Sequence, residues 1–226
     1  MLIKLGNWVF HYRNFLFIFF YATLFIPAPQ VINNSSTALI IGAIIIFLGM
    51  IIRAGTIGFV YIVRGGKNRK IHAEKLVTEG VYSVCRNPMY LGNILLILGF
   101  AFFTNSLFFL VVMFPLFCLF YIAIISAEEN FLISKFPVEY PEYKKDSNAL
   151  FPKLSKLCSF HKGYKFNFIR VIKKEYGSTF LYVSGMLLSL LFQSFITAIQ
   201  FAIYFLIALV LYLIIRVLKK KKKLVE

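Results

Sequence analysis

Six apolar runs divide this chain, and their length leaves little choice of fold. They cover residues 8–28, 38–62, 88–104, 106–127, 176–194 and 197–217. An apolar run of about 20 residues spans the hydrocarbon core of a bilayer as a helix, which satisfies its own backbone polar groups. The hydrophobic share of 60% also exceeds the roughly 45–50% of soluble domains. The sequence therefore predicts an all-α, polytopic membrane protein with about six transmembrane helices.

The charged residues alternate with these runs and predict a topology. Three connections contain no charged residue: 29–37, 104–106 and 193–197. Lys and Arg gather in the other polar segments, at Lys4 and in 64–86, 135–174 and 219–223. Because Lys and Arg accumulate on the cytoplasmic side of membrane proteins, both termini are predicted to be cytoplasmic. The net charge of +16 is interpreted as a topology signal and an attraction to anionic lipid, and not as a nucleic-acid surface.

The polar segments divide the chain into three parts. Residues 1–37 are an entry helix with an outer loop, 38–155 a membrane core with polar cytoplasmic segments, and 156–226 a basic amphipathic segment with a closing helical hairpin. Within the last part, residues 164–176 mix aromatic and basic side chains, which favours either a helix in the headgroup plane or a solvated linker. The first run is interpreted as an uncleaved helix, and the three widely spaced cysteines predict neither a disulfide nor a metal site.

The segment 80–93 places polar residues where the chain enters the third run. Asn is a favoured N-cap and Pro suits the first helical position, so a helix is predicted to start at Asn87-Pro88. The N–H groups of Met89 and Tyr90 would then join Arg86 in a pocket for a carboxylate or phosphate. Gly92 lies one turn on, where a missing side chain leaves room for a ligand. The alternative is an ordinary capped helix with a glycine for packing.

Two further polar sites lie at the end of one apolar run and inside another. Glu128 and Glu129 end the fourth run, and the short turn after the third run brings them level with Asn87. One carboxylate is predicted to face inward and hold a cationic group or a ribose, against the alternative of a solvated helix end. Arg53 in the second run is expensive to bury, so it is expected to face an anionic ligand or to reach the interface by snorkelling.

Two motifs resemble one known family. Residues Leu76-Val-Thr-Glu-Gly-Val-Tyr-Ser-Val-Cys-Arg-Asn-Pro-Met-Tyr-Leu-Gly92 are similar to the signature Gly-x-Tyr-x-x-x-Arg-His-Pro-x-Tyr-x-Gly of the isoprenylcysteine carboxyl methyltransferase and phospholipid methyltransferase superfamily. The stretch from Glu128-Glu129 through Glu139-Tyr140 to Tyr143 resembles its downstream motif, and the likeness covers roughly residues 50–155. Asn87 stands where the family has histidine, and Pro137 where it has glycine; an asparagine cannot titrate near neutrality.

The resemblance implies an integral-membrane enzyme that uses S-adenosylmethionine to methylate a membrane lipid or a prenylated acceptor, in a bacterial inner membrane or an ER-type membrane. It implies a cofactor site, facing the cytoplasm, that contains Tyr82, Arg86, Asn87, Pro88, Met89, Tyr90, Gly92, Glu128, Glu129 and Tyr140. Arg53, Arg86 and Glu129 are the predicted catalytic residues. Two alternatives stay open: an NADPH-dependent membrane reductase of the sterol-reductase type, and an inactive lipid-binding protein.

Overall fold

The computed structural model describes residues 1–60 and 71–221, which form helices and no strand. Its long helices are α1 (Leu2–Ala22), α2 (Ser35–Phe59), α4 (Pro88–Phe103), α5 (Phe114–Lys135), α7 (Phe168–Phe192) and α8 (Ala198–Lys220). The shorter ones are α3 (Val81–Val84), α6 (Glu139–Asp146), the 3₁₀ turns η1 (Thr23–Phe25) and η3 (Leu154–Lys156), and the π-helical stretch η2 (Phe109–Met113) that leads into α5. Each predicted apolar run coincides with one long helix, so the predicted all-α fold is confirmed.

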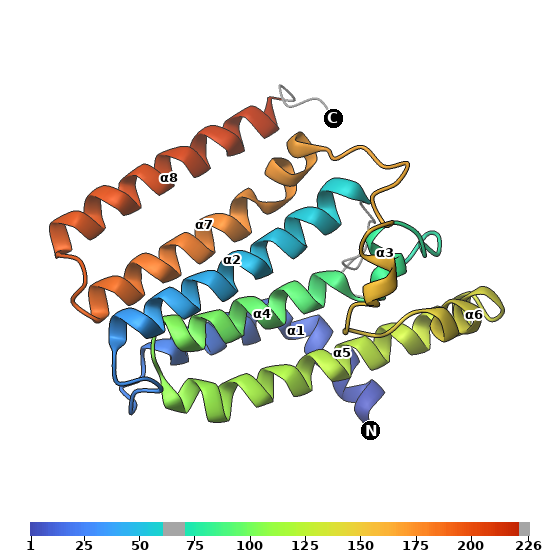
Figure 1. Cartoon of the computed structure of the whole chain (residues 1–226), viewed down its shortest axis with the longest axis horizontal. Helices are drawn as coiled ribbons and strands as arrows, with labels where there is room; N and C mark the ends of the chain where they lie inside the picture. The colour runs from blue at the N-terminus through green and yellow to red at the C-terminus, as the bar shows by residue number, and fades with distance from the viewer. Residues whose placement is uncertain (61–70, 222–226) are drawn as a thin grey trace.

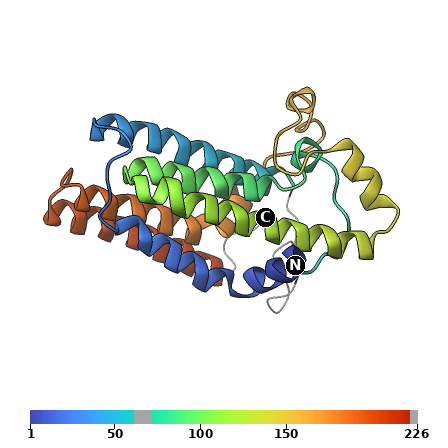
Figure 2. The same cartoon turned by 90° about the horizontal axis from the view of Figure 1, so that it is seen from below.

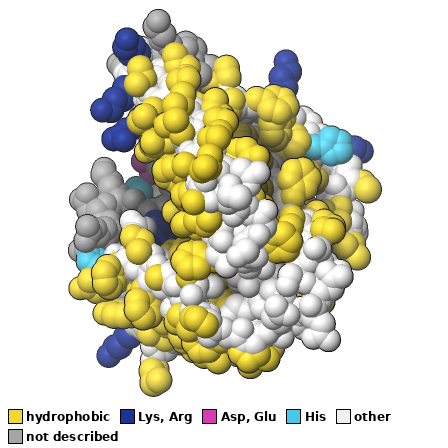
Figure 3. Space-filling view, turned by 90° about the vertical axis from the view of Figure 1, so that its left-hand side faces the viewer, with side chains coloured by type: hydrophobic (Ala, Val, Ile, Leu, Met, Phe, Trp, Pro, Cys, Tyr) yellow, Lys and Arg dark blue, Asp and Glu magenta, His cyan; other side chains and the backbone are white. Residues whose placement is uncertain are grey.

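The long helices lie side by side, and the segments that connect them lie at the two ends of the bundle (Figures 1 and 2). The three charge-free connections lie at one end, whereas α1 begins and α8 ends at the other, beside α3 and α6. Figure 3 looks onto the first end, which shows mainly hydrophobic and uncharged side chains, with Lys and Arg at its margins. The basic residues predicted at 64–70 and 222–223 lie outside the described residues. The membrane side that each end faces stays a prediction.

Among the described residues, three helices are long and apolar enough to cross a membrane. They are Ser35–Phe59, Phe109–Lys135 and Ala198–Lys220. The helix α4 is apolar but shorter, at 16 residues, and both α1 and α7 contain charged residues within their length. The predicted helices are therefore present, and the number that spans the bilayer stays a prediction.

Glycines allow α2 and α4 to pack closely against each other. Gly42 and Gly49 on α2 face Gly99 and Gly92 on α4, two turns apart on each helix. A Cβ atom built on Gly49 would lie 2.8 Å from the carbonyl oxygen of Gly92, and one built on Gly99 would lie 2.7 Å from the backbone nitrogen of Ile46. Small residues are enriched where membrane helices approach closely, because they let the backbones come together.

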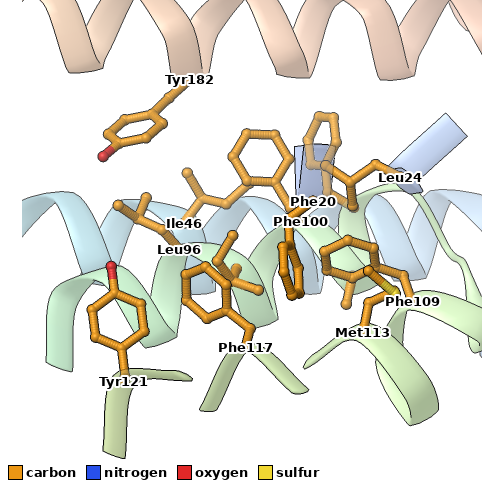
Figure 4. Packing of buried hydrophobic residues seen from close by; sticks show 13 residues of the cluster. Phe20, Leu24, Ile46, Leu96, Phe100, Phe109, Met113, Phe117, Tyr121 and Tyr182 are labelled. Atoms are coloured by element: carbon orange, nitrogen blue, oxygen red, sulfur yellow. The ribbon is translucent and has the colours of Figure 1, made fainter. Parts of the chain in front are cut away.

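Aromatic side chains fill the space between this helix pair and α1, α5 and α7. Phe100 and Phe117 are buried at its centre, with Phe20 of α1 against Phe117 at a ring separation of 5.6 Å. Figure 4 shows the cluster extending from Phe109 at one end to Tyr121 and Tyr182 at the other. Buried aromatic residues contribute large apolar areas and favour edge-to-face contacts. The hydroxyl-bearing members lie at the end that leads towards the predicted site.

Residues 164–176 do not form a helix of their own. The helix α7 begins at Phe168, where the side chain of Asn167 accepts a hydrogen bond from the N–H of Arg170 at 2.8 Å, and it continues without a break to Phe192. The basic residues from Arg170 to Lys174 therefore belong to the first turns of one continuous helix, and a position in the headgroup plane stays a prediction. The helix α8 follows and packs against α7.

Candidate functional site

The predicted start of α4 is confirmed, but Asn87 does not cap it with its side chain. Pro88 is the first residue of α4, and Asn87 precedes it in a non-helical conformation with φ −130° and ψ 58°. The Asn87 side chain instead donates from Nδ2 to the carbonyl oxygen of Ala149 at 3.1 Å, and the Asn87 N–H donates to the same oxygen at 3.1 Å. The N–H of Tyr90 donates to the Asn87 carbonyl at 3.0 Å, so it is used within the first turn of the helix.

Arg86 joins the start of α4 to α5 and α6. Its Nε and Nη2 donate to Oε1 of Glu129 at 3.1 and 2.9 Å, and its Nη1 donates to the carbonyl oxygens of Lys144, at 3.3 Å, and Ser147. The Nζ of Lys144 forms an ion pair with the other oxygen of Glu129 at 2.7 Å. Arg86 is 6% exposed. The two predicted motifs therefore meet at this buried ion pair, which organises the backbone around the site.

A cavity of about 660 Å³ lies beside this junction, within the bundle. Seven of the eleven predicted site residues line it: Arg53, Tyr82, Asn87, Pro88, Met89, Tyr90 and Glu128. Binding pockets for small molecules typically have volumes of about 300–1,000 Å³. The start of α4 and Glu128 of α5 were predicted to lie at the same level. This is confirmed, because the hydroxyl of Tyr90 donates to Oε1 of Glu128 at 2.6 Å.

The other four predicted residues lie behind the cavity wall. Arg86 and Glu129 form the ion pair described above. Gly92 faces α2, where an added Cβ would lie 2.7 Å from Cγ of Arg53, so its missing side chain makes room for a helix neighbour and not for a ligand. Tyr140 of α6 is 1% exposed and packs against Tyr143, with ring centres 6.0 Å apart.

Several lining residues were not predicted from the sequence. Arg13 and Asn14 come from α1, Asn93 from α4 and Tyr121 from α5, with Ser178 and Tyr182 from α7. The Nδ2 of Asn93 donates to the hydroxyl of Tyr121 at 2.8 Å. A signal for two of them was present, because Arg13 and Asn93 interrupt apolar runs, and polar residues inside membrane helices usually mark functional sites.

Arg53 donates hydrogen bonds to two protein partners. Its Nε donates to Oε2 of Glu175 at 2.9 Å and its Nη2 to Oε1 at 2.8 Å, while its Nη1 donates to Oδ1 of Asn93. The side chains of Arg53 and Glu175 are 9% and 13% exposed. A paired guanidinium fork of this kind gives strong, directional contacts. Arg53 therefore forms an internal ion pair between α2 and α7, and its predicted contact with an anionic ligand stays a prediction.

One thiol lies next to the motif. Cys85 precedes Arg86 and is 2% exposed, and its burial raises the pKa of the thiol to about 11. Thiolate is the reactive form of cysteine, so this residue is kept in the inert form near neutral pH.

The cavity is polar at one end and apolar at the other. Asn87, Tyr90 and Glu128 lie near the start of α4, and the deeper walls contain Leu96, Ile97, Phe117 and Ile124. A second hollow of about 670 Å³ lies beside α6, and it contains none of the predicted site residues. The first cavity therefore suits a molecule with both a polar and an apolar part.

Comparisons with known proteins agree with the motifs. The phospholipid methyltransferase family matches residues 33–139. The chain is 39% identical over 116 residues to the cobalt-zinc-cadmium resistance protein CzcN of Cupriavidus metallidurans, covering 51% of this chain and 52% of that protein. It is 34% identical over 116 residues to the nickel-cobalt-cadmium resistance protein NccN of Alcaligenes xylosoxydans xylosoxydans, covering 51% and 53%.

The chain thus spans about half the length of the curated relatives that it matches, and no solved structure matches it. The family region contains both motifs and runs from the start of α2 to the start of α6, whereas α1, α7 and α8 lie outside it. The predicted resemblance is confirmed, and residues 33–139 are a phospholipid methyltransferase family region, within the isoprenylcysteine carboxyl methyltransferase superfamily.

Proposed function

We propose that this protein is an integral-membrane methyltransferase that transfers the methyl group of S-adenosylmethionine to a membrane lipid or a prenylated acceptor. The observation that carries the proposal is that residues of two separate motifs line one cavity with a polar and an apolar end. A methyl donor that is charged and water-soluble needs the first kind of wall, and an acceptor with a long apolar tail needs the second.

The groups at the polar end of the cavity fit the parts of the cofactor. The carboxylate of Glu128 suits an amino group or ribose hydroxyls, and the positive end of the α4 dipole at Pro88 and Met89 suits a carboxylate. Tyr82 and Tyr90 offer aromatic faces for an adenine ring. When bound, S-adenosylmethionine supplies an activated methyl group on a sulfonium centre.

The protein residues then contribute alignment and exclusion of water, which are the main demands of a reaction with an activated donor. Arg86 and Glu129 act as positioning residues, because their ion pair fixes the backbone from which Asn87 and Met89 project. Asn87 offers no titratable group, so proton transfer at this position has no part in the proposed reaction. The basic segments favour a cytoplasmic position for this end of the molecule, near anionic lipid.

Calorimetry of S-adenosylmethionine binding to the purified full-length protein tests the proposal. Glu128→Gln removes one carboxylate charge and should weaken binding by about tenfold or more, as expected for loss of a hydrogen bond to a charged group. Glu142→Gln, at an exposed position of α6, is the matched control and should bind like the unmodified protein. Transfer of labelled methyl groups to total membrane lipid separates an active enzyme from a lipid-binding protein. Absence of cofactor binding by the unmodified protein refutes the proposal.

A further inference from the structure

The helix α7 lies outside the family region, yet it forms one wall of the cavity. Ser178, Leu181 and Tyr182 line it, and they lie on successive turns of one face of α7. Figure 4 shows the hydroxyl of Tyr182 pointing towards the hydroxyl of Tyr121, which comes from α5 on the opposite side. Because both tyrosines line the cavity, α7 and α5 each present one hydroxyl group to the same space.

A continuous set of hydrogen bonds connects α7 to that space. Glu175 accepts two hydrogen bonds from Arg53 on α2, Arg53 donates to Asn93 on α4, and Asn93 donates to the hydroxyl of Tyr121. The contacts cross four helices, and Glu175 itself is not a lining residue. Its carboxylate acts on the cavity through Arg53.

The charge of Arg53 decides which head group the cavity accepts. A buried cation without a partner would attract a carboxylate or a phosphate, because an unpaired charge in a low-dielectric site is very unfavourable. Glu175 neutralises the guanidinium at 2.8 and 2.9 Å. Besides this ion pair, α4, α5 and α7 offer the Asn93 amide, two tyrosine hydroxyls and apolar side chains, and the other charged lining residues are Arg13 of α1 and Glu128 of α5.

We propose that α7 is the element that selects the acceptor, with Glu175 as a positioning residue that neutralises Arg53 and holds Asn93 and Tyr121. The acceptor is a lipid whose methyl-receiving head is uncharged and forms hydrogen bonds, and whose tail is apolar. This inference rests on the proposed methyl transfer and adds the class of acceptor to it.

The main test compares which lipids receive a labelled methyl group. Total membrane lipid in detergent is incubated with the full-length protein and labelled S-adenosylmethionine, and the products are separated into acidic and uncharged fractions. The unmodified protein should label the uncharged fraction. Glu175→Gln keeps the shape of the side chain but leaves Arg53 without a counter-charge, so the ratio of acidic to uncharged product should rise by about tenfold, the order expected for one charge-assisted hydrogen bond. Arg53→Met with Glu175→Leu removes both charges and should restore the original preference.

A second variant keeps the test independent of folding. Tyr182→Phe removes one hydroxyl while retaining the ring, and it should raise KM for lipid with no change in S-adenosylmethionine affinity. Ile172→Ala, on an exposed position of α7 outside the cavity, is the matched control and should leave both quantities unchanged. A merely structural role of α7 would change cofactor affinity and lipid KM together.

The outcomes separate the two proposals. If the unmodified protein binds no S-adenosylmethionine and labels no lipid, the proposed function is refuted and the inference with it. If it labels acidic lipid from the start, or if Glu175→Gln leaves the product ratio unchanged while transfer continues, the methyl transfer stands and the role of α7 is refuted.

Discussion

Replacing Gly42 by alanine should loosen the α2–α4 pair on which the cavity is built. A Cβ at this position would lie 2.6 Å from Cα of Phe103 and 2.7 Å from the carbonyl oxygen of Gly99, and it would also press on the Phe103 nitrogen. All three are backbone atoms of α4, so no side chain can turn away and the helices must separate.

The expected effect follows from two opposing contributions. Inserting a methyl group into a packed interior costs about 1–3 kcal/mol, and contact with backbone places Gly42→Ala near the upper value. Alanine recovers up to about 1 kcal/mol of helix propensity relative to glycine. The net loss is about 2 kcal/mol, which lowers the melting temperature by roughly 4–8 °C for a protein of this size.

Gly55→Ala is the matched control on the same helix. No atom lies within 4 Å of a Cβ built on Gly55, so only the gain in propensity remains. This variant should gain roughly 1 kcal/mol of stability and melt about 2–4 °C higher. The two substitutions are chemically identical, yet they should change the melting temperature in opposite directions.

Thermal unfolding in detergent can be followed with a maleimide dye that becomes fluorescent on reaction with thiols. Cys85 is buried and reports the loss of structure, and Cys158→Ser removes the exposed thiol that would otherwise react at the start. A Gly42→Ala protein that melts at or above the temperature of the unmodified protein would refute the close packing of α2 against α4.

Two further predictions concern the junction before α4. Lysine cannot replace arginine at position 86, because it lacks the guanidinium fork that reaches Glu129 and two backbone carbonyls. Both Arg86→Lys and Arg86→Ala should therefore destabilise the protein by about 3 kcal/mol or more. Equal melting temperatures for the lysine variant and the unmodified protein would contradict this network. Burial raises the pKa of the Cys85 thiol from 9.0 to about 11, so Cys85 should be alkylated slowly at pH 8 and faster as pH rises towards 11, whereas exposed Cys158 reacts at once; mass spectrometry of the alkylated protein across that range measures both rates. Because the pKa is higher in the folded state, the thiol stabilises the fold fully below pH 9, and this contribution is lost as pH rises through 11.

The helices could be predicted from the sequence because long apolar runs have one stable form in a bilayer. The start of α4 was equally clear, since Pro88 fits the first helical position and few others. The common level of Asn87 and the Glu128–Glu129 pair followed from the short α4–α5 turn, whereas the contact of Arg86 with Glu129 at that level was not predicted. In each case a local pattern determines the structure.

The partners of Arg53 and Asn87 could not be predicted in the same way. Glu175 lies 122 residues from Arg53, among lysines that suggested a surface helix, and only the packing of α7 on α2 brings the two together. Asn87 precedes a helix as a capping residue would, but its side-chain amide binds the carbonyl oxygen of Ala149, 62 residues later. Gly92 has the spacing of a ligand site and the surroundings of a helix contact. Long-range packing decides all three.

The ion pair between Arg53 and Glu175 also has a consequence for biogenesis. At about 5–20 residues per second of synthesis, the 122 residues between them correspond to roughly 6–24 s. The arginine therefore enters the membrane with α2 before its carboxylate has been made. Asn93, only 40 residues later, arrives first. The order of translation gives Arg53 a neutral partner early and its counter-charge last, when α7 joins the bundle.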